Sequence, residues 1–417
     1  MTSDRLAILR AWAGAQASRL QLRTPEDVLR RQERMWRRFS PTLSRTPALA
    51  GLAGLPHHRL PVSTPDEVRR DFARWNTVDV SLERAVAAAE AAERGGEGGL
   101  PHGLEAGFST GTGGARGLFL VSAAERAGYL GHALARLAPA GALLGPCRIA
   151  LCLRADSALY RDVTGAGSIA FTFLGLDLPT GEKLARLNAF RPHVLIAPSH
   201  VLADISRHGC ESAGWPLRRL FYGAEPMPES ERAWIGRRLG MRPDPIYQAT
   251  EGFIGAPCRF GTLHLNEDVM IVEREAVAGT NRFQPVVTDL RRTSQPVVRL
   301  KLDDLLESAP PCRCGSPLHA IRGVEGRIGD LWRYPGRVLA PRMVEEALAT
   351  AVGPETEWRA TASPSAILIE VAPDRAEAAK LALGGLFAGA PAPPVTTAPA
   401  PLRDGPKRRR VRWESGR

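Results

Sequence analysis

The chain is organised around the stretch Phe108-Ser-Thr-Gly-Thr-Gly-Gly-Ala-Arg-Gly117. Four of these ten residues are glycines, which tolerate positive φ and let backbone N–H groups converge on an anion. An apolar run, Leu118 to Val121, follows, and Ser122-Ala-Ala-Glu125 is a capping box that predicts a helix to about Leu137. This order indicates a phosphate-binding loop, although a glycine-rich loop alone is also typical of a flexible connection.

The composition predicts a protein of several lobes in the cell interior. The 417 residues exceed one ordinary core, and no apolar run approaches the length of about 18 residues that crosses a membrane. Met1-Thr-Ser-Asp-Arg-Leu6 lacks the apolar core and cleavage site of a signal peptide. Six cysteines are few for this length. We therefore expect a cytoplasmic protein without disulfides or membrane insertion.

The charge is strongly positive, with a formal net value of +11. Lysine supplies only four of the 55 basic residues, and the arginines are spread along the whole chain. This spread indicates a compositional bias rather than a nucleic-acid footprint, so no nucleic-acid partner is expected. A positive field would still attract an anionic substrate such as a nucleotide. The one dense cluster is the tail, Lys407 to Arg412.

Three parts follow one another along the chain. Residues 1–99 are predicted to be helical and end in the glycine-rich joint Gly95 to Gly99. Residues 100–326 combine strands that alternate with helices and, after Gly252, a β-rich lobe. Residues 327–417 predict a small α+β unit. The fold class is therefore α/β with a mostly parallel sheet, whose ligands should bind at the carboxyl ends of the strands.

The expected elements follow from apolar runs and helix-start signals. Strands are predicted at 118–121, 148–153, 169–174, 194–197, 220–222 and 246–248, with helices at 122–138, 181–190, 199–209 and 228–239. The β-rich lobe should contain segments 263–272, 283–289 and 297–302. The last unit should contain helices 341–352 and 375–386 and strand 366–371.

Four further stretches carry groups suited to a nucleotide. Tyr222-Gly-Ala-Glu-Pro226 ends a predicted strand, and Tyr247-Gln-Ala-Thr-Glu-Gly252 offers an aromatic face and a carboxylate for Mg²⁺. Arg299-Leu-Lys-Leu-Asp-Asp304 provides acceptors for a sugar diol, and Gly326-Arg-Ile-Gly-Asp330 lies where the last unit joins. Each stretch alone is also typical of a solvated turn.

In this order the motifs resemble those of the acyl-adenylate-forming enzymes, in particular the branch with phenylacetate-CoA ligase and the synthetase that adenylates a deazaflavin coenzyme. The resemblance is strong over about 100 to 335 and weak in the tail. Other phrases resemble a poorly characterised subgroup of that branch: Asp71 to Thr77, Thr250 to Phe253, Gly261 to Asp268 and Cys312 to Gly315. The resemblance implies a multi-lobed adenylate-forming fold with a large α/β N-terminal domain, a β-rich subdomain and a small mobile C-terminal domain.

The resemblance also implies roles for individual residues. The ATP phosphates would be wrapped by Ser109, Thr110, Gly111, Thr112, Gly113 and Gly114. The adenine would be bordered by Gly223, Ala224, Glu225, Pro226 and Tyr247. Thr250 would contact phosphate, Glu251 would hold Mg²⁺, Asp304 would bind the ribose hydroxyls, and Arg327 would lie near ribose or phosphate.

Three positions depart from the pattern of the relatives. Gly113 stands where a Ser or Thr is common, and Gly117 where many relatives carry lysine, a loss for which Arg116 could compensate. Gly329 stands where the hinge often has Asp or Lys.

Asp404-Gly-Pro-Lys407 resembles, with a proline inserted, the Gly-Lys context of the relatives' tail lysine. The resemblance implies that Lys407 neutralises charge as a carboxylate attacks the α-phosphate. The alternative is that the basic tail is simply solvated or contacts an acidic partner.

Three thiols and an imidazole, from Cys258, His264, Cys312 and Cys314, fit a tetrahedral structural zinc, with His319 as a reserve ligand. The alternative is that these are reduced cysteines packed in a small lobe. We expect Cys147, Cys152 and Cys210 in the core. His193 and His200 could face an acyl pocket, or serve structure alone.

The sequence therefore predicts an acid-thiol ligase that uses ATP and Mg²⁺. It would convert a carboxylic acid, for which the resemblance favours an aromatic one, to an acyl-adenylate and pass the acyl group to coenzyme A or an acyl carrier protein. Two alternatives are transfer of AMP to a cofactor and a catalytically silent basic binding protein. No Ser-His-Asp, paired-carboxylate or Rossmann pattern stands out. The oligomeric state stays open.

Overall fold

The structure is a computed structural model that describes residues 2–96, 98–108, 116–139, 141–142, 145–153, 169–208, 214–400 and 408–414. The predicted phosphate loop, Ser109 to Gly114, lies outside the described residues, as do Lys407 and Cys210. Within the described part, no helix has the length and apolar character needed to span a membrane.

Helices dominate the N-terminal segment, as predicted. They are α1 (Thr2–Gln21), α2 (Pro25–Phe39), α3 (Pro65–Arg70) and α4 (Leu82–Glu93). Capping boxes at Thr24 and Thr64 begin α2 and α3. The buried side chain of Asn76 holds the segment after α3 in place. Its amide group donates to the carbonyls of Phe72 and Val80 at 2.8 and 2.9 Å. The next residue, Thr77, donates its backbone N–H to Ser294 O at 3.0 Å and so ties this segment to the β-rich lobe.

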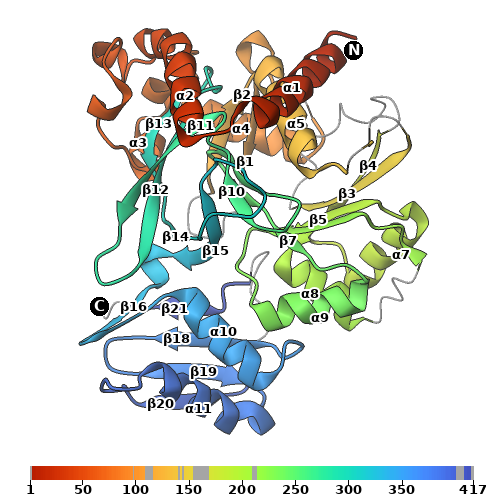
Figure 1. Ribbon diagram of the computed structural model, residues 1–417, viewed down its shortest axis with the longest axis vertical. Coiled ribbons are helices and arrows are strands. Elements are labelled where there is room, and N and C mark those ends of the chain that lie inside the picture. The colour runs from red at the N-terminus through yellow and green to blue at the C-terminus, as the bar shows by residue number, and fades with distance from the viewer. Residues whose placement is uncertain are drawn as a thin grey trace.

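A parallel sheet of five strands lies on the right-hand side of the large domain in Figure 1. Its order is β4 (Ile169–Gly175), β3 (Cys147–Leu153), β5 (Val194–Pro198), β6 (Arg219–Gly223) and β7 (Asp244–Pro245). On one face pack α7 (Thr180–Phe190), α8 (Ser199–Arg207) and α9 (Glu229–Leu239), and on the other α1 and α5 (Ala123–Leu137). Both faces are therefore covered, as the continuous apolar strands require. Cys147 and Cys152 lie in this core as predicted.

The predicted β-rich lobe is an antiparallel sheet of eight strands. They are β8 (Tyr247–Ala249), β9 (Gly252–Pro257), β10 (Leu263–Leu265), β11 (Met270–Ala276), β12 (Arg282–Asp289), β13 (Val297–Lys301), β14 (Asp304–Ser308) and β15 (Ala320–Arg327). Their order is β11-β12-β14-β15-β10-β9-β8, with β13 paired to β12.

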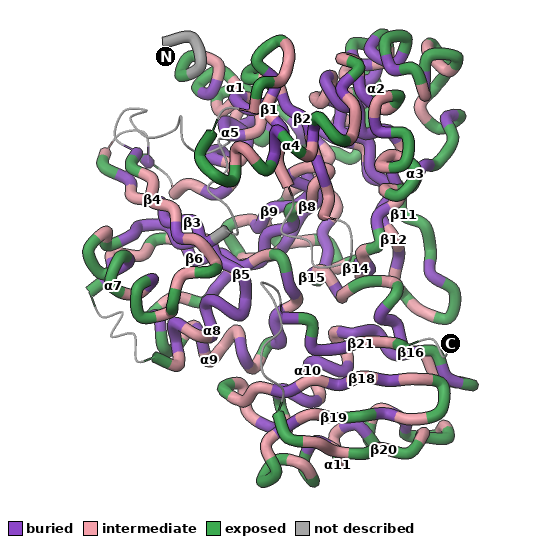
Figure 2. Tube along the Cα trace, turned by 180° about the vertical axis from the view of Figure 1, so that it is seen from behind, coloured by how far each residue is buried: buried purple, intermediate pink, exposed green. Residues whose placement is uncertain are grey.

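The C-terminal unit has its own apolar core, centred on Trp332, Trp358 and Phe387. It contains the hairpin β16 (Trp332–Tyr334) and β17 (Arg337–Leu339), helices α10 (Pro341–Val352) and α11 (Ala376–Leu386), and a second sheet. That sheet has the order β20 (Val395–Ala398), β19 (Ile367–Val371), β18 (Trp358–Ala362) and β21 (Val411–Trp413). Figure 2 shows this sheet below the large domain, with α10 between the two and with buried residues alternating with more exposed ones along β18 and β19.

Two predictions about which sheet a strand joins need correction, and the predicted segment 263–272 is divided into β10 and β11. The run Leu118 to Val121 does form a strand, β2 (Leu118–Val121), but it pairs antiparallel with β1 (Glu105–Phe108) and does not join the parallel sheet. The predicted strand 246–248 is divided, because β7 ends at Pro245 in the parallel sheet and β8 begins at Tyr247 in the antiparallel one. In both cases the apolar pattern identifies a strand but carries no information about its partner.

Candidate active site

Tyr247 and Asp304 meet at the seam between the two sheets. Tyr247 begins β8, and its hydroxyl donates to Asp304 Oδ2 at 2.7 Å. Asp304 begins β14 and pairs in register with Arg327, the last residue of β15. The Arg327 side chain is exposed, and its charge acts on the Tyr247 hydroxyl. Residues predicted separately for adenine, ribose and phosphate therefore lie together.

Glu251 occupies the turn between β8 and β9, close to the same group. Burial raises the pKa of Glu251 to about 6, and the negative charge of Asp304 acts in the same direction. Burial also raises the pKa of Tyr247 well above its ordinary value, again with help from Asp304. The site therefore concentrates negative charge in a partly desolvated place, which favours a bound cation.

Arg292 supports the turn that carries Thr250 and Glu251. Its guanidinium donates to Thr250 O and to Gln295 Oε1, each at 2.9 Å, and Gln295 Oε1 also accepts from the backbone N–H of Leu120. Thr250 is thus fixed relative to β2, the strand that follows the glycine-rich stretch. Sequence reasoning missed Arg292 and Gln295, because no local motif marks them.

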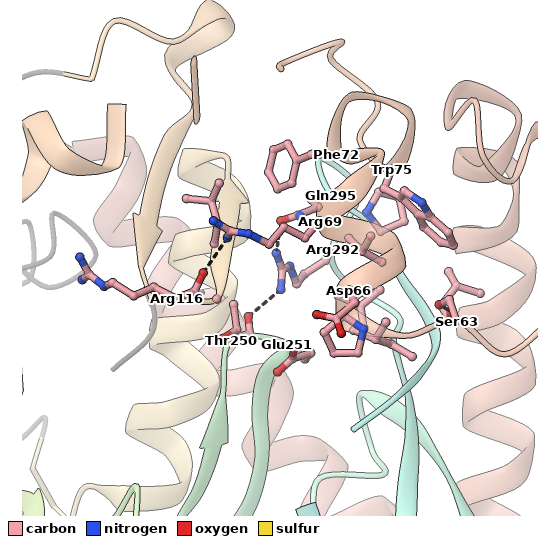
Figure 3. Close-up of a pocket in the computed structure, with 18 residues that line it drawn as sticks. Ser63, Asp66, Arg69, Phe72, Trp75, Arg116, Thr250, Glu251, Arg292 and Gln295 are labelled. Atoms are coloured by element: carbon pink, nitrogen blue, oxygen red, sulfur yellow. Dashed lines mark hydrogen bonds between the residues drawn. The ribbon is translucent and has the colours of Figure 1, made fainter. Parts of the chain in front are cut away.

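A cavity opens beside this turn and is also lined by the N-terminal segment (Figure 3). Thr250, Glu251 and Arg292 line it, together with residues of α3 and the segment after it: Asp66, Arg69, Phe72 and Trp75. Arg69 reaches across and donates from Nη1 to Arg116 O at 2.8 Å. Sequence reasoning assigned no site residue to this helical segment.

The Arg116 side chain is engaged outside that cavity. It donates from Nη1 to Glu93 Oε2 at 3.0 Å, and its guanidinium lies over the Phe108 ring at 4.0 Å from the centroid. Figure 3 shows the side chain extending away from the other lining residues. Arg69 and Arg292 are therefore the arginines whose side chains lie at the cavity in this structure.

The turn after β6, Gly223 to Pro226, lies at the carboxyl end of the parallel sheet. Ala224 is exposed and has a φ of 68°, whereas Glu225 is buried. The Glu225 carboxylate accepts from Ser199 Oγ at 2.7 Å, from His200 Nδ1 at 2.9 Å and from the backbone N–H of Arg408. Burial raises the pKa of Glu225, but His200 and Arg408 outweigh it and lower the pKa to about 2.

The two histidines considered for an acyl pocket have structural partners. His200 is bonded to Glu225 as described, and His193 Nδ1 accepts from the backbone N–H of Arg148 at 2.9 Å.

Cys258, His264, Cys312 and Cys314 form one cluster in the β-rich lobe, with their ligand atoms all within 4.8 Å of one another. The Sγ atoms of Cys258 and Cys312 are 3.8 Å apart, and Cys314 Sγ lies 3.4 Å from His264 Nε2. Two thiolates about 2.3 Å from one tetrahedral zinc would be separated by about 3.8 Å. His264 Nδ1 donates to Leu318 O at 2.9 Å, which leaves Nε2 for a metal.

His319, the reserve ligand, contacts Ser308 Oγ and Arg274 and is not part of this cluster of four.

The chain is similar to known coenzyme A ligases in sequence and in fold. No model of a known family matches the sequence. Phenylacetate-coenzyme A ligase of Pseudomonas putida is 25% identical over 199 residues, which are 44% of this chain and 45% of that enzyme. The same enzyme of Aromatoleum evansii is 24% identical over 185 residues, 40% of this chain and 41% of the relative. The matched part thus spans less than half the length of these relatives.

The fold agrees over a longer stretch. A 2-hydroxyisobutyryl-CoA ligase in complex with its acyl-adenylate, in the postadenylation state, superposes with a TM-score of 0.64 at 19% identity and covers 94% of this chain and 89% of that one. The amide bond synthetase McbA of Marinactinospora thermotolerans superposes with a TM-score of 0.55 at 17% identity, over 73% of this chain and 67% of that one. The chain has the fold of the acyl-adenylate-forming superfamily, as its motifs predicted.

The charge at Glu251 should cost stability. We expect Glu251→Gln to stabilise the protein by about 1 to 2 kcal/mol at pH 8 without Mg²⁺, because the folded state raises the pKa from 4.5 to about 6. The ionised carboxylate destabilises the fold above about pH 6, and this cost disappears below pH 4.5, where both states bind the proton.

Urea unfolding at pH 8 and at pH 4.5 measures the difference, with exposed Glu377→Gln as the control. If Glu251→Gln changes the free energy of unfolding equally at both pH values, or destabilises the protein at pH 8, the raised pKa of Glu251 is contradicted.

Proposed function

We propose that the protein activates a carboxylic acid with Mg²⁺ and ATP, forming an acyl-adenylate and pyrophosphate, and then passes the acyl group to a thiol of coenzyme A or an acyl carrier protein. The observation that carries the proposal is the convergence of Tyr247, Glu251 and Asp304 at one seam beside the cavity. The matched relatives, which are named phenylacetate-coenzyme A ligases, favour an aromatic acid.

Each side chain then has a defined task. Asp304, held by the Tyr247 hydroxyl, accepts from the ribose hydroxyls, while the turn Gly223 to Pro226 borders the adenine. Thr250 and the loop Ser109 to Gly114 bind the phosphates. Glu251 would hold Mg²⁺, which would supply charge neutralisation for the phosphates when bound.

The chemical step brings two anions together. A carboxylate oxygen of the acid attacks the α-phosphorus, the new P–O bond forms, and the bond to the leaving pyrophosphate breaks. Cations fixed in place before the reaction lower this barrier. We assign this task to Lys407, with Arg327 beside the ribose and phosphate. Arg408, the next residue, is bonded to Glu225 at the carboxyl end of the sheet, which supports a tail lysine acting there.

Exchange of labelled pyrophosphate into ATP tests the proposal. A panel of aromatic and aliphatic acids should contain at least one that drives exchange, and product formation with and without coenzyme A then identifies the acceptor. A chain that shows no exchange with any acid, while it binds ATP, would be a silent binding protein. AMP attached to a cofactor without any thiol requirement would identify an adenylyltransferase.

Lys407→Ala should slow the exchange by about a hundredfold or more, since removing one preorganised charge donor costs on the order of 3 kcal/mol of barrier. Lys380→Ala is the matched control, because Lys380 pairs with Glu377 on α11. Rates of exchange at saturating ATP compare the two. An unchanged rate in Lys407→Ala would reassign the tail to binding.

Arg69 is proposed to contact the phosphates in place of the lysine that Gly117 replaces. Its side chain lies at the cavity that Thr250 and Glu251 also line. We expect Arg69→Ala to raise the KM for ATP by about 10- to 100-fold, as for loss of a charged hydrogen bond worth roughly 1.5 to 3 kcal/mol. Its neighbour Arg70 is exposed, so Arg70→Ala should leave KM within about twofold. Equal effects of the two variants would remove Arg69 from the site.

A structural zinc is proposed for the cluster of Cys258, His264, Cys312 and Cys314. All four positions of a tetrahedral ion would be filled by protein, so the metal would fasten the β9–β10 turn to the β14–β15 connection and not activate water.

Protein purified without chelator should contain about one zinc per chain, and Cys312→Ser should lower this content and the unfolding midpoint together. Mass spectrometry of the metal content and thermal unfolding measure both, with Cys147→Ala as a control from the apolar core. Wild-type protein with far less than one zinc per chain would refute the site.

A further inference from the structure

The tail arginines, Arg408 and Arg410, are buried against the large domain. Arg408 Nη2 lies 2.7 and 2.8 Å from the two carboxylate oxygens of Glu231, and Arg410 Nη1 lies 3.0 Å from Glu231 Oε2. Glu231 belongs to α9 and is fully buried, while Arg408 is 9% exposed and Arg410 is 3% exposed. One buried carboxylate of the large domain therefore holds two cations of the tail.

A second anchor fixes the main chain of the tail. The backbone N–H of Arg408 donates to Glu225, whose carboxylate is also bound by Ser199 and His200. Ser199 follows β5 and Glu225 follows β6, so both lie at the carboxyl ends of parallel strands. The tail is thus held at the edge of the sheet where ligands of such folds bind.

The same short segment belongs to the C-terminal unit. The backbone N–H of Ala360 donates to Arg410 O at 2.7 Å, and Val411 pairs with Ala360 in the sheet of that unit. The Arg410 guanidinium also lies over the Trp358 ring, 4.9 Å from its centroid. Figure 1 shows β21 beside β18, at the edge of this sheet that is nearer the large domain. Arg410 therefore joins a strand of the C-terminal unit to a buried carboxylate of the large domain, Glu231.

Arg409, between the two, provides an internal comparison. It donates from Nε to Asp330 Oδ2 at 2.9 Å, and its side chain is 49% exposed. Asp330 precedes β16 in the C-terminal unit, so this ion pair does not connect the tail with the large domain. Arg408 and Arg410 thus pair with the large domain in addition to the C-terminal unit, whereas the Arg409 side chain pairs with the C-terminal unit through Asp330.

We propose that Arg408 is a positioning residue: its side chain, paired with Glu231 beside the bond from its backbone N–H to Glu225, fixes the tail at the active-site edge so that Lys407, joined to it by one peptide bond, can act in adenylation. The catalytic consequence rests on the proposed function. The anchor itself rests on the buried contacts alone. Without the Arg408 side chain, the buried carboxylate of Glu231 would keep only one of its two arginine partners, Arg410. The tail would then lose its fixed position.

Two readouts test the anchor and its consequence separately. Arg408→Gln should lower the maximal rate of acid-driven pyrophosphate exchange at least tenfold while the KM for ATP changes less than about twofold, because a positioning residue does not contact the nucleotide. Arg408→Lys, which keeps one charged bond to Glu231, should recover part of the rate. Arg409→Gln should remain within about twofold of the wild type.

Amide hydrogen exchange of residues 408–414 reports how firmly the tail is held, and this measurement does not depend on catalytic activity. Arg408→Gln should speed amide exchange there, and Arg409→Gln should not. Glu231→Gln should reproduce the Arg408→Gln effect, and the double variant should be no faster than either single variant, since the two side chains act as one pair.

If amide hydrogen exchange is faster in Arg408→Gln but the wild type shows no pyrophosphate–ATP exchange with any acid, the proposed function is refuted and the anchor stands. Full catalytic rate in Arg408→Gln, or identical hydrogen exchange in Arg408→Gln and Arg409→Gln, would overturn the positioning role. If Glu231→Gln fails to fold, the comparison of Arg408→Gln, Arg408→Lys and Arg409→Gln still decides the question.

Discussion

The site depends on the place where the chain leaves one sheet and enters another. Ile246 donates its backbone N–H to Tyr222 in the parallel sheet, and the next residue, Tyr247, pairs with Gly255 in the antiparallel one. This change of partner within two residues sends the turn with Thr250 and Glu251 to the edge shared by both sheets. The Tyr247–Asp304 hydrogen bond then links two strands, β8 and β14, that are not neighbours in the sheet. The candidate nucleotide contacts therefore exist only because the two sheets meet here.

Two glutamates, Glu225 buried and Glu251 partly buried, show how the surroundings set the role of one residue type. Glu225 has a hydroxyl, an imidazole and a backbone N–H as partners, so its charge is satisfied and its pKa is lowered to about 2. Glu251 lies near Asp304, and its pKa is raised to about 6. The first environment is that of a structural anchor. The surroundings of Glu251 suit a cation ligand, because a bound Mg²⁺ would offset the cost of the negative charge on its carboxylate.

Much of the fold could be predicted because its signals are local. The helix start at Ser122 was predicted from a Ser-x-x-Glu phrase whose partners are three residues apart, and the structure has this capping box. The runs at 194–197 and 220–222 likewise contain enough apolar residues to identify buried strands. Pairing was harder, as β2 shows, since its partner β1 lies on the other side of the glycine-rich stretch.

The candidate site could be predicted only where its residues sit in recognisable phrases. Tyr247, Asp304 and the cysteine cluster were found in this way, and the structure brings each group together. Arg69 and Arg292 were missed, because each acts through contacts with distant segments, such as the bond from Arg69 to Arg116. The buried role of Glu225 was also beyond sequence reasoning, since its partner Arg408 is 183 positions away. Such long-range pairs follow from tertiary packing and leave no periodic pattern in the sequence.

The central claim is that one nucleotide is bound between the glycine-rich loop and the seam that carries Glu251 and Asp304. The most direct measurement is a crystal structure of the protein with Mg²⁺ and a non-hydrolysable ATP analogue. Our account predicts the phosphates beside Ser109 to Gly114 and Thr250, the metal on Glu251, and the ribose hydroxyls on Asp304. A nucleotide bound elsewhere, with the loop and the seam in no common cleft, would contradict it.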